Sequence, residues 1–345
     1  MDRRFRALAG CGLIGLIFLF VQLGALSLVE PFESAGYQAV EDPSDPTNSV
    51  VYVALILVVT AGMLLAFRYD ADQLIRGVIV FSGAWLSLYV FRVLVPPLVT
   101  VGGINLLAVG LAALLGIGLL VHPEWYVIDA AGTVMGAAGA GLFGISFGIL
   151  PALLLLSVLA VYDAISVYGT EHMLTLASGV MDLKVPVVLV IPLSFSYSFL
   201  DATTLDPTAD DDTAADEHAG EVETATDSEP TPDDDAAAEE MDAGPLERDA
   251  LFIGLGDAVI PTVLVASAAF FAPTGITTVL GLPLPAVTAM VGTFIGLAIL
   301  LWMVLKGRAH AGLPLLNGGT IAGYVVGALA AGIGFVEAVG LAPYL

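Results

Sequence analysis

The chain has 345 residues, of which 58% are hydrophobic and only 13% are charged. Soluble globular proteins are about half apolar and about a quarter charged, so a water-soluble enzyme is excluded first. The formal net charge is -24, from 34 acidic and 10 basic residues. Because phosphate binding needs a basic surface, this balance also excludes a nucleic-acid-binding protein.

The acidity is concentrated in one polar segment. Residues 201–249 hold 19 of the 34 acidic residues and a single basic residue, Arg248. A segment with almost no large apolar side chains cannot bury enough surface to fold. We therefore expect 201–248 to be a disordered cytoplasmic loop that divides the chain into a larger N-terminal part and a smaller C-terminal part.

Apolar runs suited to a bilayer occupy most of the remaining chain. The first run follows three arginines and is too long for a signal peptide, so we expect it to persist as a helix. The sequence predicts an all-α polytopic membrane protein with nine transmembrane helices, at 7–29, 50–67, 76–98, 103–121, 127–145, 148–168, 249–271, 283–305 and 314–341. Helices one to six then lie within 1–168, and helices seven to nine within 249–345.

The basic residues favour one orientation. With nine helices and a cytoplasmic N-terminus, the inner loops contain nine of the ten basic residues, and only Arg92 lies elsewhere. A tenth helix would move Arg248, Lys306 and Arg308 to the outside. The positive-inside rule therefore favours nine helices, which places the C-terminus outside.

The apolar stretch 183–200 is the candidate for that tenth helix. Pro186 and Pro192 interrupt it, and its first half is rich in β-branched residues. A proline inside a helix costs about 3 kcal/mol. We therefore expect 169–200 to contain a re-entrant, interfacial or strand-like segment that follows the sixth helix.

Ionisable residues inside membrane helices are costly and are functional candidates by default. Asp163 lies near the inner end of the predicted sixth helix, and Asp257 lies near the inner start of the seventh. At a rise of 1.5 Å per residue, both are about 8–12 Å from the inner boundary, so the two carboxyls can face each other. Four further charged residues are expected near helix ends, where they can reach water: Glu30, Arg92, Asp129 and Glu337.

Two facing carboxyls suggest a specific chemistry. Like charges a few ångströms apart in a medium of low dielectric constant cannot both be ionised, so the pair shares a proton. The ionised carboxyl can take a proton from water while the protonated one donates to a carbonyl oxygen, which is peptide hydrolysis without a metal. Gly254 and Gly256 flank Asp257 and leave room for a neighbouring backbone. The competing interpretation is that each aspartate only hydrogen-bonds to backbone or to Arg92.

The segment 312–319 (GLPLLNGG) is a third element at the same depth. Pro314 lacks an N–H group and disfavours helical geometry at Leu313. An irregular segment here could offer free backbone groups to an extended substrate. The alternative is an ordinary helix start with a proline in its first turn, which on this segment alone is the stronger interpretation.

Two GxxxG patterns indicate close helix packing. They begin at Gly132 and at Gly323, and both lie in helices that are rich in small residues. No metal or cofactor is expected, because a single cysteine, Cys11, excludes a thiolate-rich site and no second histidine cluster accompanies Glu171-His172.

These motifs together resemble the presenilin/signal peptide peptidase family of intramembrane aspartyl proteases. The family carries YD, GxGD and PAL motifs on its sixth, seventh and ninth helices, and this chain has Tyr162-Asp163, GLGD at 254–257 and PLL at 314–316 in that order. Leu315 stands where the family has alanine. The resemblance implies that Asp163 and Asp257 are the catalytic dyad. It also implies that eight residues bind the substrate or shape the site: Tyr162, Gly254, Leu255, Gly256, Leu313, Pro314, Leu315 and Leu316.

The resemblance also implies what the protein acts on. With the N-terminus inside, its substrates are expected to be single-span proteins of the lipid bilayer, cut near the inner leaflet, and the segment 169–200 is expected to help receive them. We expect a multi-pass protein of the cell membrane that binds no nucleic acid, with a homo-oligomer as an open possibility.

Three other functions stay open on the sequence. A proton-coupled secondary transporter could use the same membrane aspartates, although the split into six and three helices argues against the internal symmetry of such proteins. A pseudo-protease would bind membrane helices without cutting them. Prepilin-type peptidases share a GxGD motif and an aspartate pair, but they are generally smaller and lack the proline motif.

Overall fold

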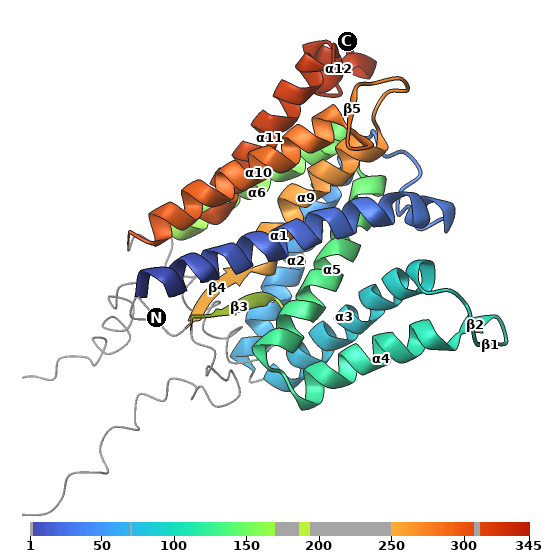
Figure 1. Cartoon of the computed structure of the whole chain (residues 1–345), viewed down its shortest axis with the longest axis vertical. Helices are drawn as coiled ribbons and strands as arrows, with labels where there is room; N and C mark the ends of the chain where they lie inside the picture. Colours follow the sequence, from blue (N-terminus) through green and yellow to red (C-terminus); the bar gives the residue numbers. More distant parts are fainter. Residues whose placement is uncertain (1–2, 70, 170–185, 194–249, 307–310) are drawn as a thin grey trace, which may run out of the picture.

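The computed structural model describes residues 3–69, 71–169, 186–193, 250–306 and 311–345. The acidic segment predicted at 201–248, and most of 169–200, lie outside the described residues. Helices dominate the described part of the chain (Figure 1). The long ones are α1 (Arg3–Ser34), α2 (Thr47–Arg68), α3 (Asp72–Leu94), α4 (Leu106–Val121), α5 (Trp125–Ser146), α6 (Ile149–Gly169), α9 (Leu255–Phe270), α10 (Leu284–Val304) and α11 (Gly312–Ala330).

Seven of these helices, all except α4 and α9, are long and apolar enough to cross a membrane. Helices α4 and α9 are apolar but have 16 residues each. At 1.5 Å per residue they span about 24 Å, which is shorter than the ~30 Å hydrocarbon core. The chain is therefore an integral membrane protein with seven candidate spans in its described part, and the count of nine stays a prediction.

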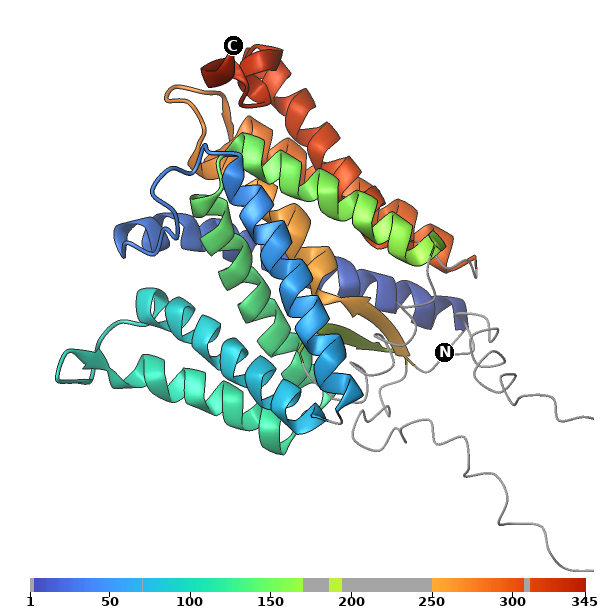
Figure 2. The ribbon, with the colours of Figure 1, turned by 180° about the vertical axis from the view of Figure 1, so that it is seen from behind.

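Helix α9 lies in the middle of the bundle and contacts α1, α5, α6, α10 and α11. Helices α10 and α11 run side by side, α6 packs against α11, and α3 and α4 form an antiparallel pair on the opposite side (Figures 1 and 2). The central position of α9 explains why most of its residues are buried, although it is one of the shortest helices.

The packing of α10 against α11 depends on glycines. A Cβ atom at Gly292 would overlap the carbonyl oxygen of Gly319, and one at Gly323 would overlap that of Thr288. The GxxxG pattern that begins at Gly323 therefore marks close helix packing, as predicted. In the pattern that begins at Gly132, a Cβ atom at Gly136 would lie 3.2 Å from Leu255 and Val259 of α9, and one at Gly132 would lie 3.0 Å from Leu189, so the close contacts are with a helix and with residue 189.

Two strands of five residues interrupt the helical architecture. Strand β3 (Val188–Pro192) pairs antiparallel with β4 (Ala250–Gly254), with Val188 opposite Gly254 and Pro192 opposite Ala250. β3 lies inside the segment for which re-entrant, interfacial and strand-like forms were left open. The helix predicted over 249–271 is wrong at its start, because residues 250–254 satisfy their backbone groups by pairing with β3 instead.

The last predicted helix, 314–341, is also too long. Helix α11 ends at Ala330, and Gly332 then adopts a left-handed conformation with φ of 87°. A glycine in this conformation ends many helices. The chain finishes with the short helices α12 (Phe335–Ala338) and η1 (Ala342–Tyr344). Two two-stranded hairpins complete the described fold: β1 (Thr100–Val101) with β2 (Ile104–Asn105), and β5 (Thr278–Val279) with β6 (Leu282–Pro283).

Candidate active site

Asp163 projects from the C-terminal part of α6 toward the start of α11. Its Oδ2 atom accepts a hydrogen bond from the backbone N–H of Leu313, at 3.0 Å between nitrogen and oxygen. The first N–H groups of a helix have no partner within the helix. Asp163 therefore accepts a hydrogen bond from an N–H group that has no partner within α11. This bond joins α6 and α11 through two residues that are 150 positions apart in the chain.

Asp257 is the third residue of α9, directly after β4. The helix start predicted at residue 249 is thus corrected to Leu255, which puts Asp257 in the first turn, because residues 250–254 form a strand. Gly254 has an extended backbone, and a Cβ atom there would lie 3.4 Å from Oδ2 of Asp257. Gly256 is exposed, and a Cβ atom there would contact only Ile260 of the same helix. Within the described residues, no other backbone approaches Gly256 closely.

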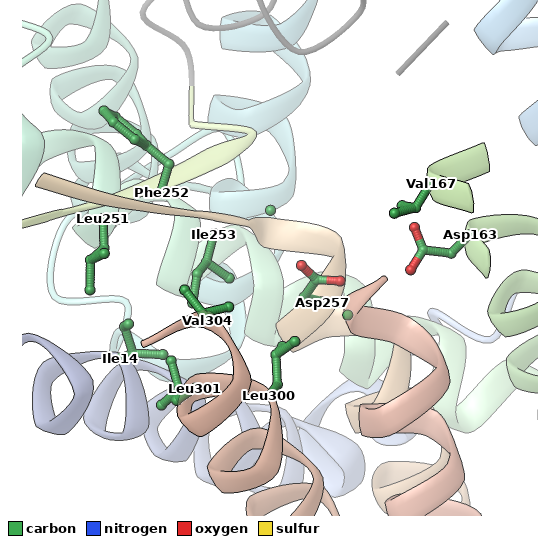
Figure 3. Close-up of a pocket in the computed structure, with 12 residues that line it drawn as sticks. Ile14, Asp163, Val167, Leu251, Phe252, Ile253, Asp257, Leu300, Leu301 and Val304 are labelled. Carbon is green, nitrogen blue, oxygen red and sulfur yellow. The ribbon is translucent and has the colours of Figure 1, made fainter. Parts of the chain in front are cut away.

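The start of α11 lies between the two aspartates. A Cβ atom at Gly312 would lie 3.2 Å from Oδ1 of Asp257, while the next residue, Leu313, donates its N–H to Asp163. Two consecutive residues at the start of one helix thus contact the two carboxylates, and the backbone of Gly312 also interacts with Asp163. The two carboxylates point toward one another across this helix start (Figure 3).

The proline motif does not form an irregular segment. Residues 312–316 are helical from Gly312 onward, with Pro314 in the first turn, so the ordinary helix start is correct. Leu316 is fully buried in the core with Leu297 and Leu300. The backbone of Leu315 packs against Gly296 of α10. Within the described residues, Leu315 and Leu316 thus fix α11 in the bundle, while Gly312 and Leu313 contact the aspartates.

Both carboxylates line one cavity of about 200 Å³ (Figure 3). Its remaining lining is apolar or glycine and comes from α1, α6, β4, α10 and α11: Ile14, Val167, Leu251, Phe252, Ile253, Gly254, Leu300, Leu301, Val304 and Gly312. None of these described lining residues is basic. The mutual repulsion of the two carboxylates is therefore not compensated by a cation in the lining, which disfavours the state in which both are ionised.

Tyr162 lies beside Asp163 in the sequence but away from the cavity. Its side chain is 46% exposed, and it is absent from the residues that line the cavity. Successive residues of a helix point about 100° apart, so the neighbour of an inward-facing residue usually faces outward. Arg92 lies in the last turn of α3, and α3 is on the opposite side of the bundle from α6 (Figure 1).

Sequence reasoning missed part of this site. Ile14 of α1 and the residues of α10 line the cavity without any local motif that could have indicated them. Asp129 was predicted to reach water near a helix end, and this is wrong. It is only 7% exposed, and its Oδ1 atom accepts a hydrogen bond from the backbone N–H of Val190 in β3.

Comparison with known proteins identifies a family and two similar structures. The family model of signal-peptide peptidase, presenilin aspartyl protease matches residues 15–333. The chain belongs to this family. Two solved structures of a presenilin family intramembrane aspartate protease, in space groups C222 and P2, are each 30% identical to it. The first covers 94% of this chain and 99% of its own, with a TM-score of 0.59, and the second covers 92% and 96%, with a TM-score of 0.57. No curated protein matches the chain.

This presenilin-family membership and the similar structures indicate an intramembrane aspartyl protease. The prediction of the family from its three motifs is confirmed. The transporter interpretation is not favoured, because neither the family nor the similar structures point to it.

Proposed function

We propose that Asp163 and Asp257 form the catalytic dyad of this presenilin-family protease and hydrolyse peptide bonds of transmembrane substrates. The observation that carries this proposal is that both carboxylates line one cavity and point toward each other across the start of α11. Gly254 and Gly312 keep the space next to Asp257 free of side chains. Leu313 holds Asp163 through its backbone N–H group.

The dyad would work with one shared proton. The ionised carboxyl takes a proton from a water molecule, whose oxygen attacks the carbonyl carbon of the substrate. The protonated carboxyl donates to the carbonyl oxygen, which gives a tetrahedral diol. Its collapse breaks the carbon–nitrogen bond, and a proton passes to the leaving amine. Neither a metal nor a covalent enzyme intermediate is required for these steps.

The substrate would be an apolar segment of a single-span membrane protein. Most of the cavity lining consists of aliphatic side chains from α1, β4 and α10, which suit apolar residues beside the cut bond. We further propose that β4 and the segment 169–200 help receive an unwound substrate strand. Because β4 leads directly into Asp257, a strand held beside it would bring a peptide bond close to the dyad.

The topology belongs to the same proposal. The N-terminus and the C-terminus lie at opposite ends of the described bundle, which supports an odd number of crossings (Figure 1). If α4 and α9 also cross the cell membrane as shorter spans, the count is nine. The N-terminus then lies in the cytoplasm and the C-terminus outside the cell. Tyr162, Leu255, Gly256, Pro314, Leu315 and Leu316 remain proposed site-shaping residues.

The test is a cleavage assay in proteoliposomes with a model single-span substrate. The products are identified by mass spectrometry, and a peptide analogue with a hydroxyl group at the scissile position serves as the inhibitor. We expect cleavage within the membrane segment and its loss with the inhibitor. Proton-driven solute uptake by the same vesicles, without cleavage or inhibitor binding, would contradict the proposal and favour a transporter. Inhibitor binding without cleavage of any substrate would indicate a pseudo-protease.

A narrower prediction concerns the N–H group of Leu313. We expect Leu313→Pro to lower the cleavage rate about tenfold, because proline removes one backbone donor to Asp163 while remaining compatible with the first turn of a helix. The preceding residue, Gly312, has no Cβ, which reduces the steric clash that proline causes.

The matched control for this prediction is Leu313→Ala. Alanine shortens the same side chain but keeps the N–H group, so the alanine variant should retain most of the activity that the proline variant loses. The initial rates of both variants, measured at equal amounts of folded protein, give the comparison. Equal losses in the two variants would mean that the side chain matters and the hydrogen bond does not.

A further inference from the structure

Asp129 is a buried carboxyl that does not line the cavity. It lies in the second turn of α5, and its Oδ1 atom accepts a hydrogen bond of 2.8 Å from the N–H of Val190. Val190 is at the centre of β3 and is itself buried. The second oxygen, Oδ2, is buried and has no hydrogen-bond partner among the described residues. Burying a carboxyl with a hydrogen bond to only one of its oxygens lowers the stability of the fold. An apolar residue would stabilise the fold more if packing were the only role of this position.

The helix that carries Asp129 also packs against the start of α9. One turn further along α5, Gly132 is close to Leu189 of β3 and to Leu255, and Gly136 is close to Leu255 and Val259. Cβ atoms at these two glycines would lie 3.0 Å from Leu189 and 3.2 Å from Leu255, respectively. One face of α5 therefore contacts both β3 and the residue two positions before Asp257.

The contacts form a continuous series that ends at the proposed dyad. Asp129 fixes Val190, which lies opposite Phe252 in the register of β3 and β4. The N–H of Leu255 then donates to the carbonyl oxygen of Val187, so the residue directly before β3 binds the first residue of α9. β4 passes into α9 without a loop. The register of this strand pair consequently determines how far Asp257 extends into the cavity.

We infer that Asp129 is a positioning residue for Asp257. A slip of one residue between the strands would move the start of α9 by about 3.3 Å. A displacement of about 1 Å can cost a hundredfold in rate. The carboxyl of Asp129 resists such a slip because it binds β3 at one point of its backbone, and without it the buried N–H of Val190 would lose its partner. This inference rests on the proposed function of Asp257.

The experiment compares Asp129→Ala with Asp129→Asn in the full chain. We expect kcat to fall about tenfold in the alanine variant with KM nearly unchanged, because the chemical step depends on the position of Asp257. Asparagine keeps an oxygen that can accept from Val190, so the asparagine variant should remain within about threefold of the wild type. Hydrogen–deuterium exchange of peptides that cover 186–193 should be faster in the alanine variant alone.

A matched control lies one turn away on the same helix. Among the described residues, the hydroxyl of Thr133 donates to the carbonyl oxygen of Asp129 within α5 and not to β3, so Thr133→Val should change neither kcat nor the exchange of β3. The inference is overturned if Asp129→Ala keeps the exchange and kcat of the wild type, or if asparagine loses as much as alanine. If Asp163 and Asp257 variants also cleave, the proposed function fails, but the exchange comparison still decides whether Asp129 holds β3.

Discussion

Asp163→Asn and Asp257→Asn are each expected to reduce cleavage by about a thousandfold or more. An amide has nearly the size of a carboxyl but cannot take up or donate the shared proton, and general acid–base catalysis supplies about 10²–10⁴ in rate. Because both carboxyls belong to one dyad, the double variant should be hardly worse than either single variant. Initial rates with the model single-span substrate, measured on equal amounts of folded protein, provide the comparison.

Folding has to be measured alongside activity. Removing a carboxyl from an apolar cavity lowers the cost of burying charge, so the Tm of each variant in detergent should not fall. Asp45→Asn is a suitable control, because this carboxyl lies in the loop before α2 and its Oδ1 accepts from the N–H of Thr47, far from the cavity. It should leave cleavage unchanged. Cleavage near the wild-type rate in either dyad variant would refute the assignment of that aspartate.

Gly319→Ala should lower the stability of the protein by about 1–3 kcal/mol, the typical cost of overpacking a filled interface. A Cβ atom at this position would overlap the carbonyl oxygen of Gly292, and backbone atoms cannot rotate away as side chains can. Helix α11 would have to move away from α10. Because Asp163 accepts a hydrogen bond from the backbone N–H of Leu313 in α11, the cleavage rate should fall together with stability.

The neighbouring glycine offers the matched control. Gly318 lies on the same helix, is exposed, and has no atom within 4 Å of the position that a Cβ would occupy. Alanine is a better helix former than glycine by about 1 kcal/mol, so Gly318→Ala should leave Tm unchanged or raise it slightly. Thermal unfolding of both variants in detergent measures the difference. A Tm of Gly319→Ala at or above that of Gly318→Ala would show that the two helices do not pack as closely as described.

The amino-acid sequence by itself determined the membrane class, the approximate positions of the helices and the family. Each of these depends on local information: apolar runs fit the bilayer, and the motifs at 162–163, 254–257 and 314–316 are short and ordered. The pairing of Asp163 with Asp257 also followed from their positions near the inner ends of successive helices. The structure places both in one cavity.

Tertiary structure decided the features for which local and long-range preferences compete. Residues 250–254 are apolar enough for a helix, and only the partner strand at 188–192 makes them β4. Asp129 looked like a charge at a helix end, but Val190, which is 61 residues away, gives it a buried partner. Leu313 binds Asp163 from a distance of 150 residues along the chain. Such hydrogen bonds depend on which distant segments lie next to each other, and no pattern within a short stretch of sequence specifies the partner.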